Sequence, residues 1–238
     1  MQRLRQLAGV ESSAHARRRF QRWCVATTQR LGLRVRVEGR ASAVPCVYVA
    51  NHRSYLDIPL LGGALGAAFL SRADVAAWPL VGSAARAIGT VFIDRDEPAS
   101  RAAAARGLAR RLRECGVVVF AEGTTGGAPL PAPFFAGLFR LLQRIGVPVV
   151  PVTIRYGDRR AYWLDARGIA AHLRGVLAAR GLDAAVHIGA AIDPAASRDA
   201  AALGAAVHAA VSAPIHAHGE LASVAARRLR PPRRVRRD

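Results

Sequence analysis

The chain has 238 residues, of which 52% are hydrophobic, and its 35 basic and 16 acidic residues give a formal net charge of +19. This apolar content supports one folded domain and excludes a wholly disordered chain. The charge favours polyanionic partners such as anionic lipid, an acidic carrier protein or nucleic acid, but does not choose among them.

The first predicted element is a basic amphipathic helix over residues 14–33. Apolar or small side chains recur there at three- and four-residue spacing, namely Phe20, Trp23, Cys24, Thr27 and Leu31, while arginines fill many of the other positions. Such a helix can lie in a membrane interface. It can equally pack on the domain with a solvated Arg face. We treat residues 1–33 as a helical segment ahead of the main domain.

Short apolar runs then alternate with longer Ala- and Arg-rich segments across residues 34–226. The predicted strands are 34–37, 46–50, 67–70, 117–121, 147–156 and a strand near 185–189, and the predicted helices are 54–63, 99–115, 134–145, 166–179 and 198–211. This alternation is typical of an α/β domain with a sheet flanked by helices on both faces. Residues 227–238 are Arg clusters around two prolines, which predicts a disordered basic tail.

The sequence lacks two features that would place the protein across or beyond a membrane. The weakly charged stretch 58–71 is shorter than the ~20 residues of a spanning helix and contains three glycines, so we expect a soluble or peripheral chain. No long apolar run follows Arg3 and Arg5, which indicates no secretory signal. The three cysteines are widely spaced, which favours a reducing compartment over a disulfide framework or a zinc site.

The segment Asn-His-Arg-Ser-Tyr-Leu-Asp at 51–57 follows a predicted strand and opens a predicted helix. His52 suits a general base because its ordinary pKa lies near neutrality, and Asp57 could orient the ring. Residues five apart on a helix diverge by ~140°, so His52 would have to lie before the helix and fold back. The alternative is a capping box, Ser54-x-x-Asp57, with His52 an ordinary loop residue.

Two further blocks end in polar residues. Arg95 follows the β-branched and aromatic run 90–93 and could bind a phosphate there. The alternative is a strand that ends in a solvated Asp94–Arg95 pair. Glu122, Gly123 and Thr124 follow a buried strand and open a Gly-rich loop, where backbone N–H groups can approach an anion. A plain turn has the same composition. A fourth block, 147–154, contains two prolines that suit a strand start or edge and is interpreted as structural.

Taken in order, the four blocks resemble the motifs of the 1-acyl-glycerol-3-phosphate (lysophospholipid) acyltransferase family. The matching stretches are Asn-His-x4-Asp at 51–57, Phe-Ile-Asp-Arg at 92–95, Phe-x-Glu-Gly-Thr at 120–124 and Val-Pro-Val-Val-Pro at 147–151. The resemblance covers about half the chain. It implies a glycerolipid acyltransferase fold bound peripherally at the cytoplasmic face of the cell membrane. It also implies that His52 is the base, that Asp57 orients it, and that Arg95, Glu122, Gly123 and Thr124 hold the acceptor.

The resemblance implies transfer of a fatty acyl group from acyl-CoA or acyl carrier protein to a lysolipid hydroxyl, with no metal or other cofactor. The first acceptor expected is 1-acyl-glycerol-3-phosphate, giving phosphatidic acid. Ala121 stands where the family usually has Pro, and Thr125 where it often has Arg or Ser. The Glu-Gly-Thr-Thr form resembles the branch that acylates lyso-ornithine lipid, which is the alternative acceptor.

Two rival classes remain for comparison. A nucleic-acid-binding protein would explain the charge but not four ordered motifs, and the sequence contains no helix-turn-helix, RRM-like or zinc-finger signature. We therefore expect nucleic acid not to be a partner, and an anionic membrane surface to be one. A catalytically inactive lipid-binding relative is disfavoured because His52 and Asp57 are both present.

Overall fold

The computed structural model describes residues 2–77, 82, 85, 86, 88–164, 168–179 and 181–218, and of residues 2–13 only the backbone. Seven strands lie in this part of the chain: β1 (Leu33–Glu38), β2 (Val47–Ala50), β3 (Ala68–Arg72), β4 (Val91–Ile93), β5 (Val117–Phe120), β6 (Val149–Tyr156) and β7 (Leu182–Ile188). The main helices are α1 (Gln2–Arg30), α2 (Asp57–Leu65), α4 (Pro98–Arg111), α5 (Ala136–Ile145), α6 (Gly168–Ala178) and α7 (Ala200–His218).

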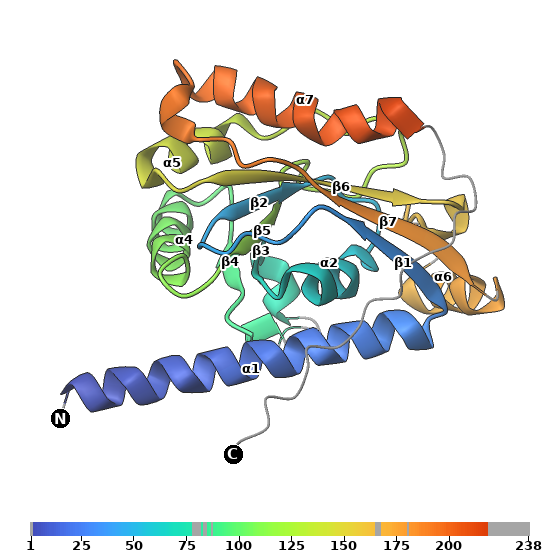
Figure 1. Ribbon diagram of the computed structural model, residues 1–238, viewed down its shortest axis with the longest axis horizontal. Coiled ribbons are helices and arrows are strands. Elements are labelled where there is room, and N and C mark those ends of the chain that lie inside the picture. The colour runs from blue at the N-terminus through green and yellow to red at the C-terminus, as the bar shows by residue number, and fades with distance from the viewer. Residues whose placement is uncertain are drawn as a thin grey trace.

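The strands form one mixed sheet in the order β1-β7-β6-β2-β5-β3-β4 (Figure 1). Neighbouring strands run parallel except β6 and β7, which are antiparallel. The central strands β2 and β6 are buried along their whole length, which explains why their sequences are almost continuously apolar. The predicted α/β class, with a mixed sheet between helices, is confirmed.

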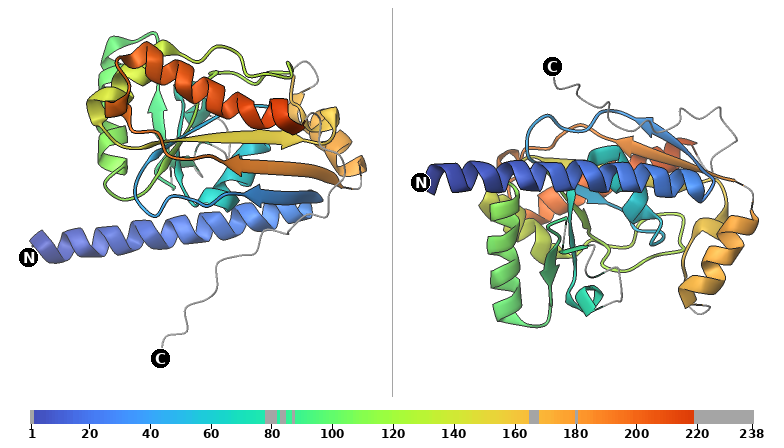
Figure 2. Two further views of the ribbon diagram at one scale, coloured as in Figure 1. Left: turned by 45° about the horizontal axis from the view of Figure 1, so that its top comes forward. Right: turned by 90° about the horizontal axis from the view of Figure 1, so that it is seen from below.

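Alternate residues of each strand feed two separate cores. In β2, Tyr48 and Ala50 face the core beneath α1, α2 and α6, whereas Val47 and Val49 face the core beneath α4, α5 and α7. Figure 2 shows α7 lying over one face of the sheet and α1 crossing the opposite side. Strands β2, β5 and β6 are parallel neighbours, so their carboxyl ends lie together at one edge of the sheet. His52 follows the end of β2, and Glu122 follows the end of β5.

The first helix begins earlier than predicted and packs against the domain. Cys24, Val25 and Thr28 are buried, and a Cβ on Gly62 of α2 would lie 2.5 Å from the Cys24 Sγ atom, so the two helices meet closely. Trp23 stays 53% exposed. The interpretation that the helix packs on the domain is therefore confirmed, while its place in a membrane interface stays a prediction.

The other predicted elements are found with small shifts and a few misses. The strand β4 was foreseen only as one interpretation of the run before Arg95, and β7 begins three residues before the predicted start. Pro151 lies inside the interior strand β6 rather than at an edge, one residue before the ladder with β7 begins. The tail predicted for 227–238 lies outside the described residues.

The helix α7 was predicted to end near residue 211, but it continues through Pro214 to His218. Its window Ala200–Ala217 has a mean hydropathy of 1.3 over 18 residues, enough by length and composition to cross a membrane. The sequence-based expectation overlooked this stretch. The helix packs on the sheet through Leu203, Val207 and Val211, and only 28% of the window is buried.

Candidate active site

The loop that follows β2 is fixed to β6 by a buried amide. Asn51 Nδ2 donates to the Ile154 carbonyl at 2.9 Å, and Asn51 Oδ1 accepts from the Ile154 N–H at 2.7 Å. The side chain therefore satisfies one backbone donor and one backbone acceptor of β6, beyond the last paired residue of β2. This anchor sets the position from which His52 leaves the sheet.

Asp57, the first residue of α2, is fully buried, and its carboxylate faces the loop. Oδ2 lies 2.8 Å from His52 Nδ1 and accepts from the backbone N–H groups of Arg53 at 2.6 Å and Ser54 at 3.0 Å. Oδ1 accepts from the Tyr156 hydroxyl at 2.7 Å. His52 therefore lies ahead of the helix and folds back over its first turn, as the spacing required.

This geometry selects one tautomer of His52. The backbone N–H groups of Arg53 and Ser54 can only donate, so Asp57 Oδ2, which receives both, acts as an acceptor toward the ring. His52 Nδ1 must then carry the proton, which leaves the lone pair on Nε2. A histidine in this form is ready to take a proton from a substrate hydroxyl.

The capping interpretation is realised only in part. Asp57 does accept the Ser54 N–H, as a capping box requires, and the Ser54 hydroxyl accepts from the Leu56 N–H at 3.3 Å. The N-cap residue of α2 is Leu56, however, and its side chain forms no cap. The same carboxylate thus closes the turn and holds the histidine.

An aromatic ring fixes the imidazole from a second direction. Phe120, the last residue of β5, stacks on His52 with 3.9 Å between ring centroids and 15° between the planes. The histidine ring is held at one edge by Asp57 and on one face by Phe120. A stacked aromatic face also favours the imidazolium that forms once the ring has taken a proton.

Glu122 holds the same loop through hydrogen bonds to backbone N–H groups. Its Oε1 accepts from the His52 backbone N–H at 2.8 Å, and its Oε2 accepts from the Ala132 N–H at 2.8 Å. Arg53 Nη1 lies 3.6 Å from Oε2, and the Glu122 side chain is 1% exposed. The structure thus brings Glu122 to the site but commits its carboxylate to protein donors. Its predicted contact with an acceptor remains a prediction.

The Arg95 side chain packs directly against Gly123. Gly123 has φ +77°, and a Cβ there would lie 2.0 Å from Arg95 Nη1, so the guanidinium rests directly on the glycine backbone. The Arg95 Cζ atom also lies 5.6 Å from the centre of the Phe135 ring. Thr124, the next residue of the loop, is exposed.

The charge of Arg95 is poorly compensated. Burial lowers the pKa of Arg95, nearby Arg72 lowers it further, and Asp96 acts in the opposite direction. In the part of the chain that the structure describes, no carboxylate forms an ion pair with Arg95. A bound anion would relieve this electrostatic cost, which fits the predicted phosphate-binding role.

Four residues of this site were not predicted: Asn51, Arg53, Phe120 and Tyr156. Tyr156 is fully buried, and burial followed by the charge of Asp57 raises its pKa well above the ordinary value. Its place at the end of a predicted strand was visible in the sequence. Its partner was not, because the contact depends on how β6 is positioned against α2.

Sites of other kinds are not evident among the described residues. They contain no group of three or more His, Cys, Asp or Glu side chains arranged to hold a metal ion. Cys24, Cys46 and Cys115 are free thiols, and burial raises the pKa of each.

Proteins that are similar to this chain carry acyltransferase names. The model of a protein family described as Acyltransferase matches residues 34–155. A lyso-ornithine lipid O-acyltransferase of Pseudomonas aeruginosa is 39% identical over 179 residues, which is 72% of this chain and 68% of that protein. One of Rhodobacter capsulatus is 38% identical, over 66% of this chain and 59% of that protein. A 1-acyl-sn-glycerol-3-phosphate acyltransferase of Neisseria meningitidis is 32% identical, over 46% of this chain and 43% of that protein.

A solved structure supports the fold. The crystal structure of the 1-acyl-sn-glycerophosphate acyltransferase PlsC from Thermotoga maritima aligns with a TM-score of 0.65, covering 89% of this chain and 81% of that one. The sequence identity is 23%, so this likeness concerns the fold alone.

If His52 is the base, His52→Ala should lower turnover by ~10²–10⁴ while the protein stays folded. Asp57→Asn should cost less turnover, but it should also lower the melting temperature, because the Asn amide cannot accept all the hydrogen bonds that Asp57 accepts. Turnover per folded molecule, measured with circular dichroism as the control, separates the roles. Unchanged turnover per folded Asp57→Asn molecule would leave capping as the role of Asp57.

Glu122→Gln tests whether this carboxylate positions the loop. A Gln side chain presents one oxygen and one NH₂ group, so either the part-buried His52 N–H or the exposed Ala132 N–H loses its acceptor, at a cost of up to about 1–3 kcal/mol when the His52 N–H is the one affected. We expect a lower melting temperature and a lower kcat, with the KM for the acceptor little changed. Glu114→Gln, at a partly exposed ion pair with Arg111, is the matched control. A selective rise in acceptor KM would instead show direct contact between Glu122 and the acceptor.

Proposed function

Because the chain belongs to the acyltransferase family, we propose that it transfers a fatty acyl group from a thioester donor to the free hydroxyl of a lysolipid. The observation that carries this proposal is the pairing of His52 Nδ1 with the buried Asp57, which leaves Nε2 available as the base. Two features support the pairing: Phe120 stacks on the ring, and Glu122 holds the backbone of His52.

The proposed reaction needs one proton relay. His52 Nε2 takes the proton of the acceptor hydroxyl as the oxygen attacks the thioester carbonyl. Asp57 stabilises the resulting imidazolium across the 2.8 Å contact. The tetrahedral intermediate then collapses, the C–S bond breaks, and the imidazolium returns its proton to the leaving thiolate. The products are an ester and a free thiol.

The donor in this proposal is acyl-CoA or acyl carrier protein. Both present the acyl group as a thioester, and the reaction exchanges a C–S bond for a C–O bond without any change of oxidation state. We therefore propose that the enzyme works without a metal or other cofactor. The net charge of +19 suits either donor, since both are anionic.

For the acceptor, we propose lyso-ornithine lipid as the first candidate. The two relatives that carry this substrate in their names align over a larger share of the chain than the Neisseria protein does. Thr125 also stands where an Arg would supply another phosphate anchor. The second candidate is 1-acyl-glycerol-3-phosphate. It is favoured by Arg95, whose guanidinium lies against the Gly123 backbone without a carboxylate partner among the described residues.

The deciding assay offers purified enzyme a labelled acyl donor with lyso-ornithine lipid and lysophosphatidic acid side by side. We expect the higher kcat/KM with lyso-ornithine lipid. Arg95→Ala should raise the KM of the preferred acceptor about tenfold or more, because the acceptor loses a charge-assisted contact with the guanidinium. The KM of the donor should change much less. Arg106→Ala, at an exposed position of α4, controls for the lost charge. Equal effects on both substrates would make Arg95 structural, and no transfer to either acceptor would refute the proposed function.

We further propose that the enzyme binds peripherally to the cytoplasmic face of an anionic membrane. Trp23 is 53% exposed on α1 and stacks on Phe20 at 5.8 Å, beside the exposed Arg18 and Arg19. Aromatic and basic side chains on one helix can combine apolar insertion with attraction to anionic head groups. The exposed position of Trp23 supports this surface as the contact.

Vesicle flotation tests the membrane contact. Full-length protein should float with anionic vesicles at low salt and less at high salt, since the attraction of ~1 kcal/mol per Arg is screened. Trp23→Ser should weaken flotation more than deletion of 227–238, because only Trp23 adds an apolar anchor. Deleting residues 1–33 is unsuitable, as it would remove Cys24, Val25 and Thr28 from the core. If both variants float like the full chain, the contact lies elsewhere.

A further inference from the structure

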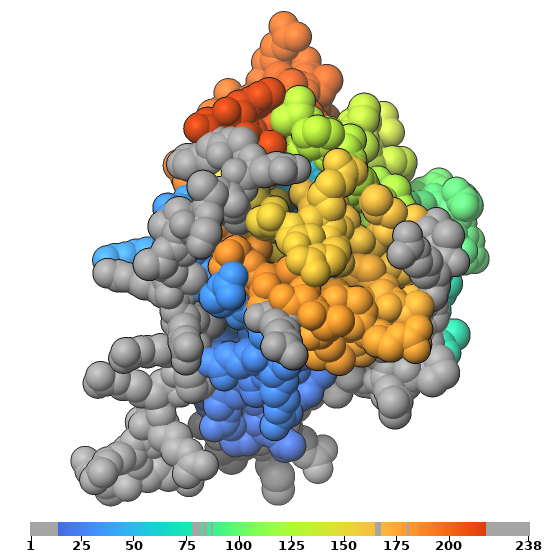
Figure 3. Space-filling view, turned by 90° about the vertical axis from the view of Figure 1, so that its right-hand side faces the viewer, coloured from blue at the N-terminus to red at the C-terminus, as the bar shows by residue number. Residues whose placement is uncertain are grey.

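A second segment of the chain, the turn after β6 together with α6, contacts the loop 51–56 that carries His52. The backbone N–H of Trp163 donates to the Arg53 carbonyl at 2.9 Å. The Trp163 ring also packs edge-on against Tyr55, with 5.7 Å between ring centroids and 72° between the planes. Figure 3 shows α6 at the surface of one end of the molecule, next to the turn that follows β6. This segment therefore restrains the loop through both backbone and side chain.

His172 of α6 adds two hydrogen bonds to this contact. Its Nε2 atom lies 3.0 Å from the Tyr162 carbonyl, and its Nδ1 atom lies 2.9 Å from the Tyr55 hydroxyl. A carbonyl only accepts, so in the neutral imidazole Nε2 carries the proton and Nδ1 accepts from the Tyr55 hydroxyl. The two rings also meet edge-on, with 5.3 Å between their centroids. One imidazole thus joins the loop 51–56 to the turn after β6.

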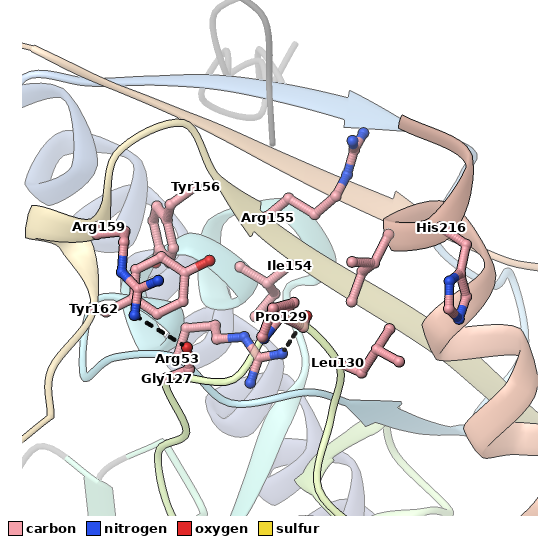
Figure 4. A pocket seen from close by; sticks show the side chains of 11 residues that line it. Arg53, Gly127, Pro129, Leu130, Ile154, Arg155, Tyr156, Arg159, Tyr162 and His216 are labelled. Carbon is pink, nitrogen blue, oxygen red and sulfur yellow. Dashed lines mark hydrogen bonds between the residues drawn. The ribbon is translucent and has the colours of Figure 1, made fainter. Parts of the chain in front are cut away.

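The Tyr162 end of this link also reaches the His52–Asp57 pair. The Tyr162 ring packs edge-on against Tyr156, with 6.2 Å between centroids and 66° between the planes. The Tyr156 hydroxyl in turn donates to Asp57 Oδ1 at 2.7 Å. Figure 4 shows Tyr156 and Tyr162 next to each other in the wall of a pocket at the end of β6. His172 is therefore connected both to the loop that carries His52 and to the tyrosine that holds Asp57.

The helix α6 has little other anchorage. The structure describes all of α6, and Val176 is the one residue of this helix that is buried. Ile169 and Leu177 are exposed although both are large and apolar. A helix that buries one side chain gains little from burial, so its position depends on specific polar contacts. Loss of the His172 hydrogen bonds would therefore loosen α6 and Tyr55 together.

We propose that His172 is a positioning residue for acyl transfer. By holding Tyr55 and Tyr162, it keeps the loop 51–56, and with it His52, in the geometry that the base needs. It acts through the loop and not on the substrate. This inference rests on the proposed function, in which His52 is the base. Because a displacement of about 1 Å can lower turnover by ~10²-fold, a small loosening of the loop should be visible in kcat.

The first test compares substitutions at the two ends of the link. Tyr55→Phe removes the hydroxyl and keeps the ring against Trp163, whereas His172→Leu removes both hydrogen bonds. We expect either variant to lower kcat per folded molecule about tenfold, with the KM of both substrates little changed. His172→Gln should keep most of the turnover, since an amide can both accept and donate. Gln143→Leu, which removes a hydrogen bond from α5 to the Ser197 carbonyl, is the matched control and should lower only the melting temperature.

The double variant Tyr55→Phe/His172→Leu should lose no more turnover than His172→Leu alone, because both substitutions break one link. Additive losses would overturn the positioning role. So would a kcat within about twofold of the wild type in both single variants. Equal losses in His172→Leu and His172→Gln would also overturn it, because Gln supplies a donor and an acceptor in place of the imidazole.

Histidine ¹⁵N NMR of the full chain gives a second readout that needs no activity. The His52 signal is assigned by its absence from His52→Ala. The wild type should show His52 with its proton on Nδ1, whereas Tyr55→Phe and His172→Leu should show a larger share of the Nε2–H tautomer, because the contact with Asp57 is loosened. The same tautomer in all three proteins would overturn the inference. A wild type that transfers no acyl group would refute the proposed function, and the NMR comparison would still decide whether His172 positions His52.

Discussion

The carboxylate of Asp57 is a buried charge that must be fully hydrogen-bonded, and much of the local structure is arranged to meet that need. Its partners come from three places: the His52 ring and two backbone N–H groups from the loop after β2, and the Tyr156 hydroxyl from the end of β6. All of them converge only when β2, β6 and α2 are correctly packed. The geometry of the His52–Asp57 pair thus depends on how these core elements pack.

Two other polar side chains extend this arrangement. Asn51 pairs with the backbone of Ile154, and Glu122 accepts one N–H from His52 and one from Ala132. The Ile154 groups lie beyond the end of the β2–β6 ladder, and the His52 N–H follows the last residue of β2, so these side chains replace strand partners that are missing there. The backbone N–H and the Nδ1 atom of His52 are therefore both held by protein groups, while part of its side chain stays exposed.

The parts that sequence could predict are those governed by local rules. Apolar runs identified β2, β5 and β6, and the spacing of His52 and Asp57 required the loop to fold back, which it does. Tyr156, Phe120 and Arg53 escaped prediction because their partners depend on how separate strands are placed side by side. The interpretation of Glu122 as a ligand for the acceptor came from its motif. Its burial and its two backbone partners could appear only once the loop 122–132 was folded.

The arginines show a second limit of prediction from sequence. All 35 basic residues are Arg, so residue type cannot separate functional cations from compositional ones. Burial separates them. Arg53 is buried beside Glu122, and Arg95 is desolvated near Arg72. Two buried nitrogens of Arg155 have no hydrogen-bond partner among the residues that the structure describes. Most surface arginines interact with water at little cost, and their ion pairs contribute little. Desolvation raises the energy of a cation that has no nearby anion, so burial, and not residue type, marks the arginines at which a negative charge would be most favourable. Arg95, which burial and Arg72 both disfavour as a cation, is the clearest case.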